Sequence, residues 1–242
     1  MKKAIRYILL TVCVCVFCYS AYNLINIYLN YKKIDDDYGE LAKTYTEEKE
    51  EKESYLQINW DELLQRNKDV KAWIQIPNTN VNYPVLQGET NDTYIHSDID
   101  HNELSAGSIF IASENEDPFN DFNTVIYGHN MKNGSMFGKL KQMYESEKYK
   151  DSKYLWICTP NGKYRYEIFS MQYAKVGSDV YTLFSAHDEQ FEAYVKKMAK
   201  QSKVDMKALG LGQDDYVVTL STCTSDESVR FVVQARWVGT YK

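Results

Sequence analysis

Three side chains in this sequence have the chemistry of a thiol acyl-transfer site: Cys223, His129 and Arg230. A thiolate is a strong nucleophile, and a histidine exchanges protons near neutral pH. A guanidinium favours the thiolate and can also hold an oxyanion. The alternative for Cys223 is a small, buried and unreactive core residue, as free cysteines commonly are. The surrounding pattern decides between these two interpretations.

Cys223 and Arg230 are predicted to stand side by side in a hairpin. Residues 216–222 and 229–238 are two β-type runs, joined by a short loop rich in Ser, Thr, Asp and Glu. Cys223 directly follows the first run, and Arg230 opens the second. A hairpin therefore places the guanidinium beside the thiol.

His129 is predicted to lie at a third strand end. The β-type run 123–127 stops at Gly128, and His129 follows just ahead of a polar turn. A nucleophile, an acid–base group and a cation, each presented at a strand end, are the parts of a cysteine acyl-transfer site.

Four motifs occur together in one order along the chain: Tyr83-Pro-Val-Leu-Gln87 with Asn91 and Tyr94-Ile95 behind it, Tyr127-Gly-His-Asn-Met131, Thr219-Leu-Ser-Thr-Cys223, and Arg230-Phe-Val-Val. In these motifs the sequence resembles the sortases, and specifically the class B sortases. The resemblance runs from about residue 60 to the C-terminus. Their joint occurrence is far more specific than any one motif.

The resemblance implies a membrane-anchored cysteine transpeptidase. Sortases cut a C-terminal sorting motif after its Thr, in class B of the Asn-Pro-x-Thr-Asn or Pro-x-Thr-Gly kind. They form a thioacyl-enzyme and pass the acyl group to an amine of the peptidoglycan precursor. The implied partners are surface proteins that carry a sorting signal, and that amine. The chemistry of the three residues allows Cys223 to be the nucleophile, His129 to give and take the proton, and Arg230 to hold the oxyanion or the substrate backbone, together with a backbone N–H near Cys223.

The resemblance also implies a set of substrate-binding residues, two from a loop near residue 90, two from the loop before the inserted helix, and two beside the nucleophile: Asn91, Ile95, Tyr181, Thr182, Ser221 and Thr222. Leu183 and Phe184 are alternative contacts in the second loop. For each of these residues, packing is the competing explanation.

Three other functions remain open from the sequence. A cell-surface cysteine peptidase would use the same acyl-enzyme with water as the acceptor. An L,D-transpeptidase carries its Cys two residues before its Arg, in a Gly-Cys-x-Arg setting that Ser221-Thr-Cys-Thr-Ser does not reproduce. In a non-catalytic adhesion domain the Cys, His and Arg would be incidental.

The N-terminus is predicted to be a transmembrane anchor, in a first domain of residues 1–31. Residues 7–31 are 25 residues without a charge. As a helix they would reach about 37 Å, enough to cross a hydrocarbon core of about 30 Å. A cleaved signal peptide is the alternative, but no clear small-x-small cleavage site follows. Lys2, Lys3 and Arg6 before the span predict a cytoplasmic N-terminus and an extracellular catalytic domain.

Residues 32–57 are predicted to be a charged stalk, and residues 58–242 the catalytic domain. Residues 32–56 hold five Lys and nine Asp or Glu. Such a segment cannot bury enough apolar surface for a core, so it is either a solvated helix or a flexible linker.

The catalytic domain is predicted to be mainly β, an eight-stranded barrel of the sortase type. A helix is expected over residues 58–70, with Asn59 as its cap, and another is inserted between the sixth and seventh strands over residues 187–200. The expected strands are 72–76, 81–86, 107–111, 123–127, 154–159, 164–173, 216–222 and 229–238.

No cofactor, metal or nucleic acid is expected. The net charge is −6, and there is no basic stripe interleaved with aromatic residues. No glycine-rich phosphate loop or Cys/His ligand set is present. Residues 96–103 begin like a calcium loop, but Glu103 stands where the turn glycine is needed, so a polar surface loop is the interpretation.

Cys158 is predicted to be a core residue. A disulfide with Cys223 is the alternative, but it would consume the catalytic thiol. Three further cysteines, Cys13, Cys15 and Cys18, lie within the expected membrane span.

Overall fold

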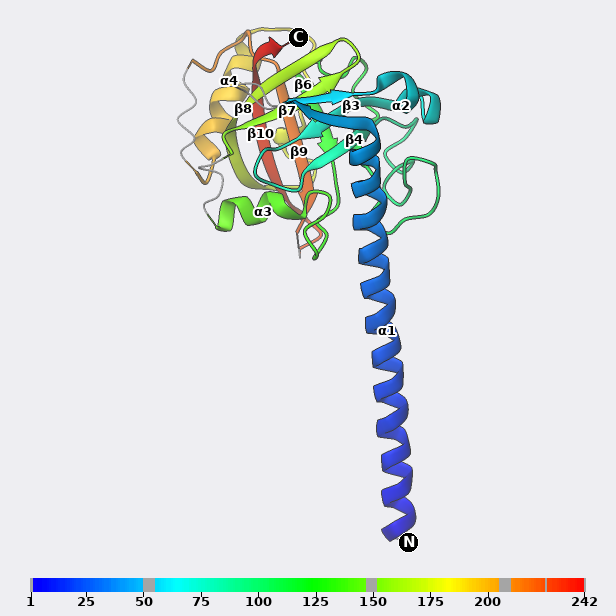
Figure 1. Cartoon of the computed structure of the whole chain (residues 1–242). Coiled ribbons are helices and arrows are strands. Elements are labelled where there is room, and N and C mark those ends of the chain that lie inside the picture. Colours follow the sequence, from blue (N-terminus) through cyan, green and yellow to red (C-terminus); the bar gives the residue numbers. More distant parts are fainter. Residues whose placement is uncertain (1, 50–54, 147–151, 205–209, 225, 242) are drawn as a thin grey trace. The chain divides into compact units, whose positions relative to one another are not determined.

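The structure of the protein is a computed structural model. It describes residues 2–49, 55–146, 152–204, 210–224 and 226–241. The chain divides into two compact units, one up to Glu40 and one from Leu41 onward. The order of the elements can be followed in Figure 1.

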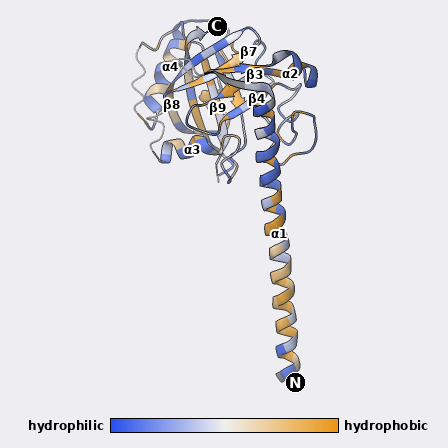
Figure 2. Ribbon diagram, in the orientation of Figure 1, coloured by the Kyte–Doolittle hydropathy of each residue, from blue (hydrophilic) through white to orange (hydrophobic). Residues whose placement is uncertain are grey.

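The N-terminal element is one long helix, α1 (Lys2–Tyr45). Figure 2 shows that α1 begins with polar residues, continues as a long apolar stretch and then becomes polar again. By length and composition α1 could cross a membrane. The charged segment after residue 31 is expected to be either a solvated helix or a flexible linker. The structure shows a helix as far as Tyr45.

A small antiparallel sheet follows, made of β1 (Thr46–Lys49) and β2 (Tyr55–Ile58), which the sequence analysis did not predict. The expected helix then appears as α2 (Trp60–Arg66). Its predicted cap is confirmed, because the side chain of Asn59 accepts a hydrogen bond from the backbone N–H of Glu62.

The body of the protein is a closed β-barrel, as expected. Around the barrel the strands follow the order β10-β8-β7-β3-β4-β5-β6-β9, and β9 pairs with β10 to close it. The strands are β3 (Val70–Gln75), β4 (Asn82–Leu86), β5 (Ile109–Ile111), β6 (Asn123–Tyr127), β7 (Tyr154–Thr159), β8 (Gly162–Lys175), β9 (Val217–Cys223) and β10 (Val229–Tyr241).

Two further helices accompany the barrel. The helix α4 (Glu189–Gln201) lies between β8 and β9, the sixth and seventh barrel strands in chain order, where an inserted helix was expected. Asp188 caps it by accepting hydrogen bonds from the N–H groups of Gln190 and Phe191. Its apolar stripe packs against β8, β9 and β10 in one buried cluster. The helix α3 (Gly138–Glu145), between β6 and β7, was not predicted.

Cys158 lies in β7 with 2% of its surface exposed and is a free thiol. Burial raises its pKa to about 12, so the thiolate is disfavoured. Its prediction as a core residue is confirmed.

The second arginine of β10, Arg236, lies in a partly buried ion pair. Its side chain is only 16% exposed, and its guanidinium lies 3.0 Å from a carboxylate oxygen of Glu167 and 3.6 Å from one of Asp215. Glu167 stands opposite Arg236 on β8, and this cross-strand pairing brings the two charges together. On its other side Arg236 stands opposite Val217, at the far end of β9 from Cys223.

Candidate active site

The barrel brings the three predicted catalytic residues to neighbouring strand ends. β9 pairs with β10 so that Cys223 stands opposite Arg230. On its other side β9 runs parallel to β6, with Tyr127 opposite Ser221. The N–H of Gly128 donates to the Ser221 carbonyl at 3.1 Å, and His129 is the next residue. The backbone of Cys223 is described as the last residue of β9, whereas its thiol lies outside the described part of the structure.

Gly128 lets the strand end close tightly against its neighbours. A Cβ atom at this position would lie 2.5 Å from Ile109 Cδ1 and 2.7 Å from Phe137 Cδ2. Both distances are well below van der Waals contact. Only glycine therefore fits directly before His129 without moving the surrounding side chains.

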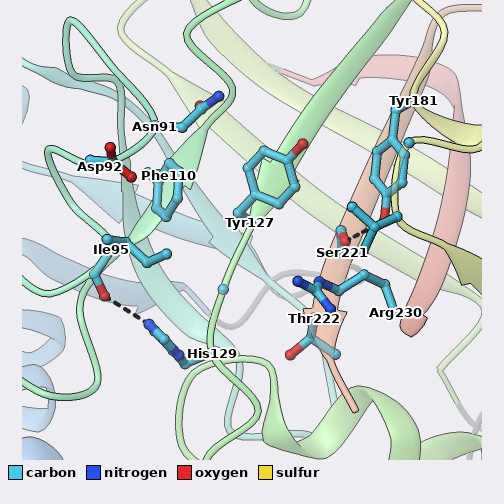
Figure 3. Close-up of a pocket in the computed structure, with 13 residues that line it drawn as sticks. Asn91, Asp92, Ile95, Phe110, Tyr127, His129, Tyr181, Ser221, Thr222 and Arg230 are labelled. Carbon is cyan, nitrogen blue, oxygen red and sulfur yellow. Dashed lines mark hydrogen bonds between the residues drawn. The ribbon is translucent and has the colours of Figure 1, made fainter. Parts of the chain in front are cut away.

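A pocket of about 360 Å³ opens at these strand ends (Figure 3). It is lined by residues of the loop between β4 and β5, of β5, of the end of β6, of the loop after β8, and of the ends of β9 and β10: Asn91, Asp92, Ile95, Phe110, Tyr127, Gly128, His129, Val176, Gly177, Tyr181, Ser221, Thr222 and Arg230.

His129 is held by the backbone of the loop between β4 and β5. Its Nε2 atom lies 2.7 Å from the carbonyl oxygen of Ile95. A carbonyl oxygen only accepts hydrogen bonds, so Nε2 carries a proton in this contact, and Nδ1 is left to titrate. The ring stacks on that of His96, with 5.5 Å between centroids.

These surroundings lower the pKa of His129 below its ordinary value. Burial is the main cause, because it removes water from the charged imidazolium. The hydrogen bond to Ile95 acts in the opposite direction, and the nearby His96 lowers the pKa further. His129 is therefore held toward its neutral form near neutral pH.

The guanidinium of Arg230 is oriented by its own turn. Its Nη1 atom donates to the carbonyl oxygens of Glu227 at 2.7 Å and Val229 at 3.1 Å. Because these bonds fix one edge of the planar fork, the group is held in place at the wall of the pocket. A fixed cation at this position can stabilise an oxyanion beside the nucleophile.

Two tyrosines and a serine form one wall of the pocket. The hydroxyl of Tyr181 is 2.9 Å from the Oγ atom of Ser221, and its ring stacks on Tyr127 at 6.3 Å. Burial raises the pKa of Tyr127 to about 12, so this phenol stays neutral. The wall is therefore aromatic, with hydroxyl groups as its polar points.

Thr222 presents a polar atom that lacks a partner within the described residues. Its side chain is 1% exposed, and its Oγ1 atom is buried without a hydrogen bond. A buried unpaired hydroxyl costs stability.

Five of the six predicted substrate-binding residues line the pocket, namely Asn91, Ile95, Tyr181, Ser221 and Thr222. The sixth, Thr182, does not; it is exposed, and its carbonyl oxygen accepts a hydrogen bond from Asn123 at 3.0 Å. Lining alone does not assign a binding role, so all six remain predictions.

The amide of Asn91 is occupied by the protein itself. Its Nδ2 atom donates to both carboxylate oxygens of Glu114, and its Oδ1 atom accepts from the N–H of Ser113 at 2.9 Å. The bond from Asn91 is the main cause that lowers the pKa of Glu114. Asn91 is thus a rigid part of the pocket rim.

Sequence reasoning missed several lining residues, among them Asp92, Phe110 and Val176. It also placed His96 in a polar surface loop without any relation to His129. Within that loop Asp98 accepts hydrogen bonds from the N–H groups of Asp100 and Asn102, which organise its turn. No group of His, Cys, Asp and Glu that could hold a metal occurs among the described residues.

A closed barrel that presents cysteine, histidine and arginine at three adjacent strand ends has the parts of a cysteine acyl-transferase. Comparison with known proteins agrees. The family described as the sortase domain matches residues 74–238. Sortase B of Listeria monocytogenes is 35% identical over 187 residues, which cover 73% of each chain. Sortase B of Staphylococcus aureus is 27% identical over 98% of this chain and 97% of its own.

The solved structure of sortase B from Bacillus anthracis has the same fold. Its TM-score is 0.75 at 29% identity, with 87% of this chain and 99% of that chain covered. The chain belongs to the sortase family and is a cysteine transpeptidase of the sortase B type.

Proposed function

We propose that this enzyme is anchored in the cell membrane by α1, cleaves a C-terminal sorting motif after its Thr, and joins the protein to a peptidoglycan amine. The motif is of the Asn-Pro-x-Thr-Asn or Pro-x-Thr-Gly type. The N-terminus is cytoplasmic, the catalytic domain extracellular, and the limits of the three domains are residues 1–31, 32–57 and 58–242. The partners are surface proteins with a sorting signal and the peptidoglycan precursor.

The observation that carries the proposal is the convergence of three strand ends on one pocket. Cys223 is paired with Arg230 through the β9–β10 ladder, and His129 follows the strand on the other side of β9. Nucleophile, proton carrier and oxyanion holder are thus supplied by adjacent strands, which a barrel keeps rigid.

In the first half-reaction the neutral His129 takes the proton of the Cys223 thiol, and the resulting thiolate attacks the carbonyl carbon of the motif's Thr. The carbonyl oxygen becomes an oxyanion, which the guanidinium of Arg230 stabilises. The C–N bond then breaks, and the departing amine takes a proton from His129. The product is a thioester between the Thr acyl group and Cys223.

In the second half-reaction an amine attacks the thioester. His129 takes the amine's proton, the new C–N bond forms, and Cys223 leaves as the thiolate. The thiolate then recovers the proton from His129, so the full cycle returns both groups to their earlier protonation states. A pocket wall with aromatic rings and few polar groups favours occupancy of the pocket by a peptide over occupancy by water.

Solved relatives support both halves of this proposal. A sortase B of Staphylococcus aureus has been solved as a substrate complex, and another sortase B structure is a complex with triglycine. The first agrees with a peptide donor, and the second with an amine-bearing acceptor.

The test is incubation of the enzyme with peptides of both motif types, with and without an added amine such as triglycine. Mass spectrometry should detect cleavage after Thr, a thioacyl adduct on Cys223, and an amide product when the amine is present. Production of the free acid alone, even at high amine concentration, would indicate a peptidase and contradict transpeptidation. Absence of cleavage of either motif would contradict the proposed substrate.

A further inference from the structure

The loop that carries Tyr181 into the pocket is held by an unusual pair of contacts. Residues 176–188 join β8 to α4, with a short 3-10 helix η2 (Asp179–Tyr181) in the middle. The carbonyl oxygens of Val180 and Thr182, on either side of Tyr181, both lie within hydrogen-bond distance of the Nδ2 atom of Asn123, at 3.2 and 3.0 Å. One side-chain amide therefore clamps the backbone on both sides of the pocket-wall tyrosine.

The orientation of this amide is fixed from behind. The Oδ1 atom of Asn123 accepts a hydrogen bond from Thr219 Oγ1 at 2.6 Å, and Thr219 Oγ1 accepts one from Gln234 Nε2 at 3.1 Å. None of these three side chains has exposed surface. Buried networks in which each polar group is satisfied hold a single geometry, because any rotation would leave a group unpaired.

Tyr194 of α4 completes the clamp. Its hydroxyl donates to the Val180 carbonyl oxygen at 2.9 Å and lies 3.1 Å from the Nδ2 atom of Asn123 and 2.8 Å from Gln234 Nε2. The inserted helix is thereby tied to the pocket-wall loop through one hydroxyl group.

The clamp also connects the loop to all three catalytic strands. Asn123 lies on β6, six residues before His129; Thr219 lies on β9, four before Cys223; Gln234 lies on β10, four after Arg230. The position of the loop is thus set by the same strands that position the reacting groups.

We propose that Asn123 is a positioning residue for the peptide substrate, which holds Tyr181 against Ser221 so that the pocket wall is formed before the substrate binds. This inference rests on the proposed function in taking the ligand to be a sorting-motif peptide. Asn123 does not line the pocket and takes no part in proton or acyl transfer. Its effect is on binding, because a loop that must be ordered by the substrate weakens affinity.

The experiment compares Asn123→Ala with the wild-type full chain in detergent, using a fluorogenic sorting-motif peptide. Loss of the clamp should raise KM about tenfold, the order expected for one buried hydrogen-bonded group, and change kcat less than about threefold. Labelling of Cys223 by iodoacetamide should keep its rate, because so small a reagent needs no pocket wall.

Two further variants make the test specific. Tyr194→Phe removes a single hydroxyl from the clamp and should raise KM by a smaller factor in the same direction. Ser170→Ala is the matched control: the Ser170 hydroxyl is equally buried, donates to the Met198 carbonyl of α4 and accepts from Gln172 Nε2. Gln172 Nε2 also lies 3.4 Å from Gln234 Oε1, so Ser170 borders the clamp without bonding to the loop. It should leave KM unchanged. If Asn123→Ala does not fold, Tyr194→Phe carries the test alone.

Hydrogen exchange measures the clamp independently of turnover. The amides of residues 179–184 should exchange faster in Asn123→Ala and Tyr194→Phe, and at the wild-type rate in Ser170→Ala. This result would support the clamp whether or not the wild-type enzyme cleaves a sorting peptide. A wild-type enzyme that cleaved no sorting peptide would contradict only the proposed function. Unchanged exchange in both clamp variants, an unchanged KM, or an equal rise of KM in Ser170→Ala would overturn the inference.

Discussion

The imidazole of His129 is anchored on the backbone of Ile95, with 2.7 Å between Nε2 and the carbonyl oxygen. The two residues are far apart in sequence, and the contact depends on how the loop between β4 and β5 is packed. Gly107 lies directly against this carbonyl. It has a φ of +55°, and a Cβ atom there would come within 2.3 Å of the Ile95 oxygen. The glycine therefore leaves the carbonyl group free to hold His129.

Replacement of Gly107 by Ala is expected to lower kcat at least tenfold, because the new methyl group must displace the Ile95 carbonyl from His129. Steady-state cleavage of a sorting-motif peptide measures this. Gly210→Ala is the matched control, since Gly210 has a similar φ of +72° but no atom of the described residues within 4 Å of its Cβ position. Equal activity of the two variants would contradict the role given to Gly107.

The pKa of His129 is expected to lie below the ordinary value of about 6.5, and NMR titration of its ring protons measures it directly. His96→Asn should raise it, because His96 disfavours the imidazolium. A lowered folded-state pKa means that the unfolded chain binds the proton first. The stabilisation from His129 is then full above about pH 6.5 and is lost as the pH falls through the folded-state pKa. A midpoint at or above the ordinary value would refute this account of burial.

Only one of the two cysteines that follow residue 31 is expected to be reactive. In a chain lacking residues 1–31, iodoacetamide should label Cys223 and leave Cys158 unmodified, because Cys158 is buried and its pKa is raised to about 12. Cys223→Ala or His129→Ala should reduce peptide cleavage by on the order of 10³-fold or more without unfolding the domain. Cys158→Ala should keep its activity; equal loss in Cys158→Ala and Cys223→Ala would show that the wrong thiol had been chosen.

The sequence predicts those features that rest on local periodicity. The barrel strands, the cap at Asn59 and the helix after Asp188 all follow from side-chain patterns within a few residues. By contrast, α3 begins after Phe137, whose side chain makes no capping hydrogen bond, so its start carries no sequence signal. Its first residue, Gly138, is also a poor helix former.

Site features that depend on long-range packing were not predictable in the same way. The stacking of His96 on His129 and the contact between His129 and Ile95 arise where a loop meets a strand end. The ion pair of Arg236 with Glu167 arises because β10 pairs with β8 in the register that places the two residues opposite each other. No spacing along one segment encodes such contacts, since each needs the closed order of the barrel.

Removal of residues 1–31 is expected to give a soluble and active enzyme, because the uncharged stretch ends there and polar residues follow. Removal of residues 1–59 should be more harmful. Leu56 and Ile58 are buried, and the N–H of Asn59 donates to the carbonyl oxygen of Tyr45 at 2.9 Å. Thermal melting and peptide turnover of both truncated chains measure the difference. If the chain lacking residues 1–31 aggregated while the full chain in detergent was folded, the boundary at residue 31 would be misplaced.

The two arginines of β10 are expected to respond differently to the same mild change. Arg230→Lys keeps the charge but loses the planar fork whose Nη1 atom bonds to the carbonyls of Glu227 and Val229. The cation would then no longer be fixed beside the nucleophile, and kcat should fall by about tenfold or more. Arg236→Lys keeps a charge near Glu167 at the other end of β9, so turnover should be unchanged. Because the substitution disturbs the partly buried ion pair with Glu167, the melting temperature should fall instead.

Turnover of a fluorogenic sorting-motif peptide and melting curves of both variants are the measurements. Because Arg230 stands opposite Cys223 and Arg236 opposite Val217, the length of β9 separates the two guanidinium groups. The result therefore tests the register of the β9–β10 ladder as well as the role of Arg230. A fully active Arg230→Lys beside an inactive but folded Arg236→Lys would mean that the oxyanion holder lies elsewhere and that the site has been built on the wrong end of the strand.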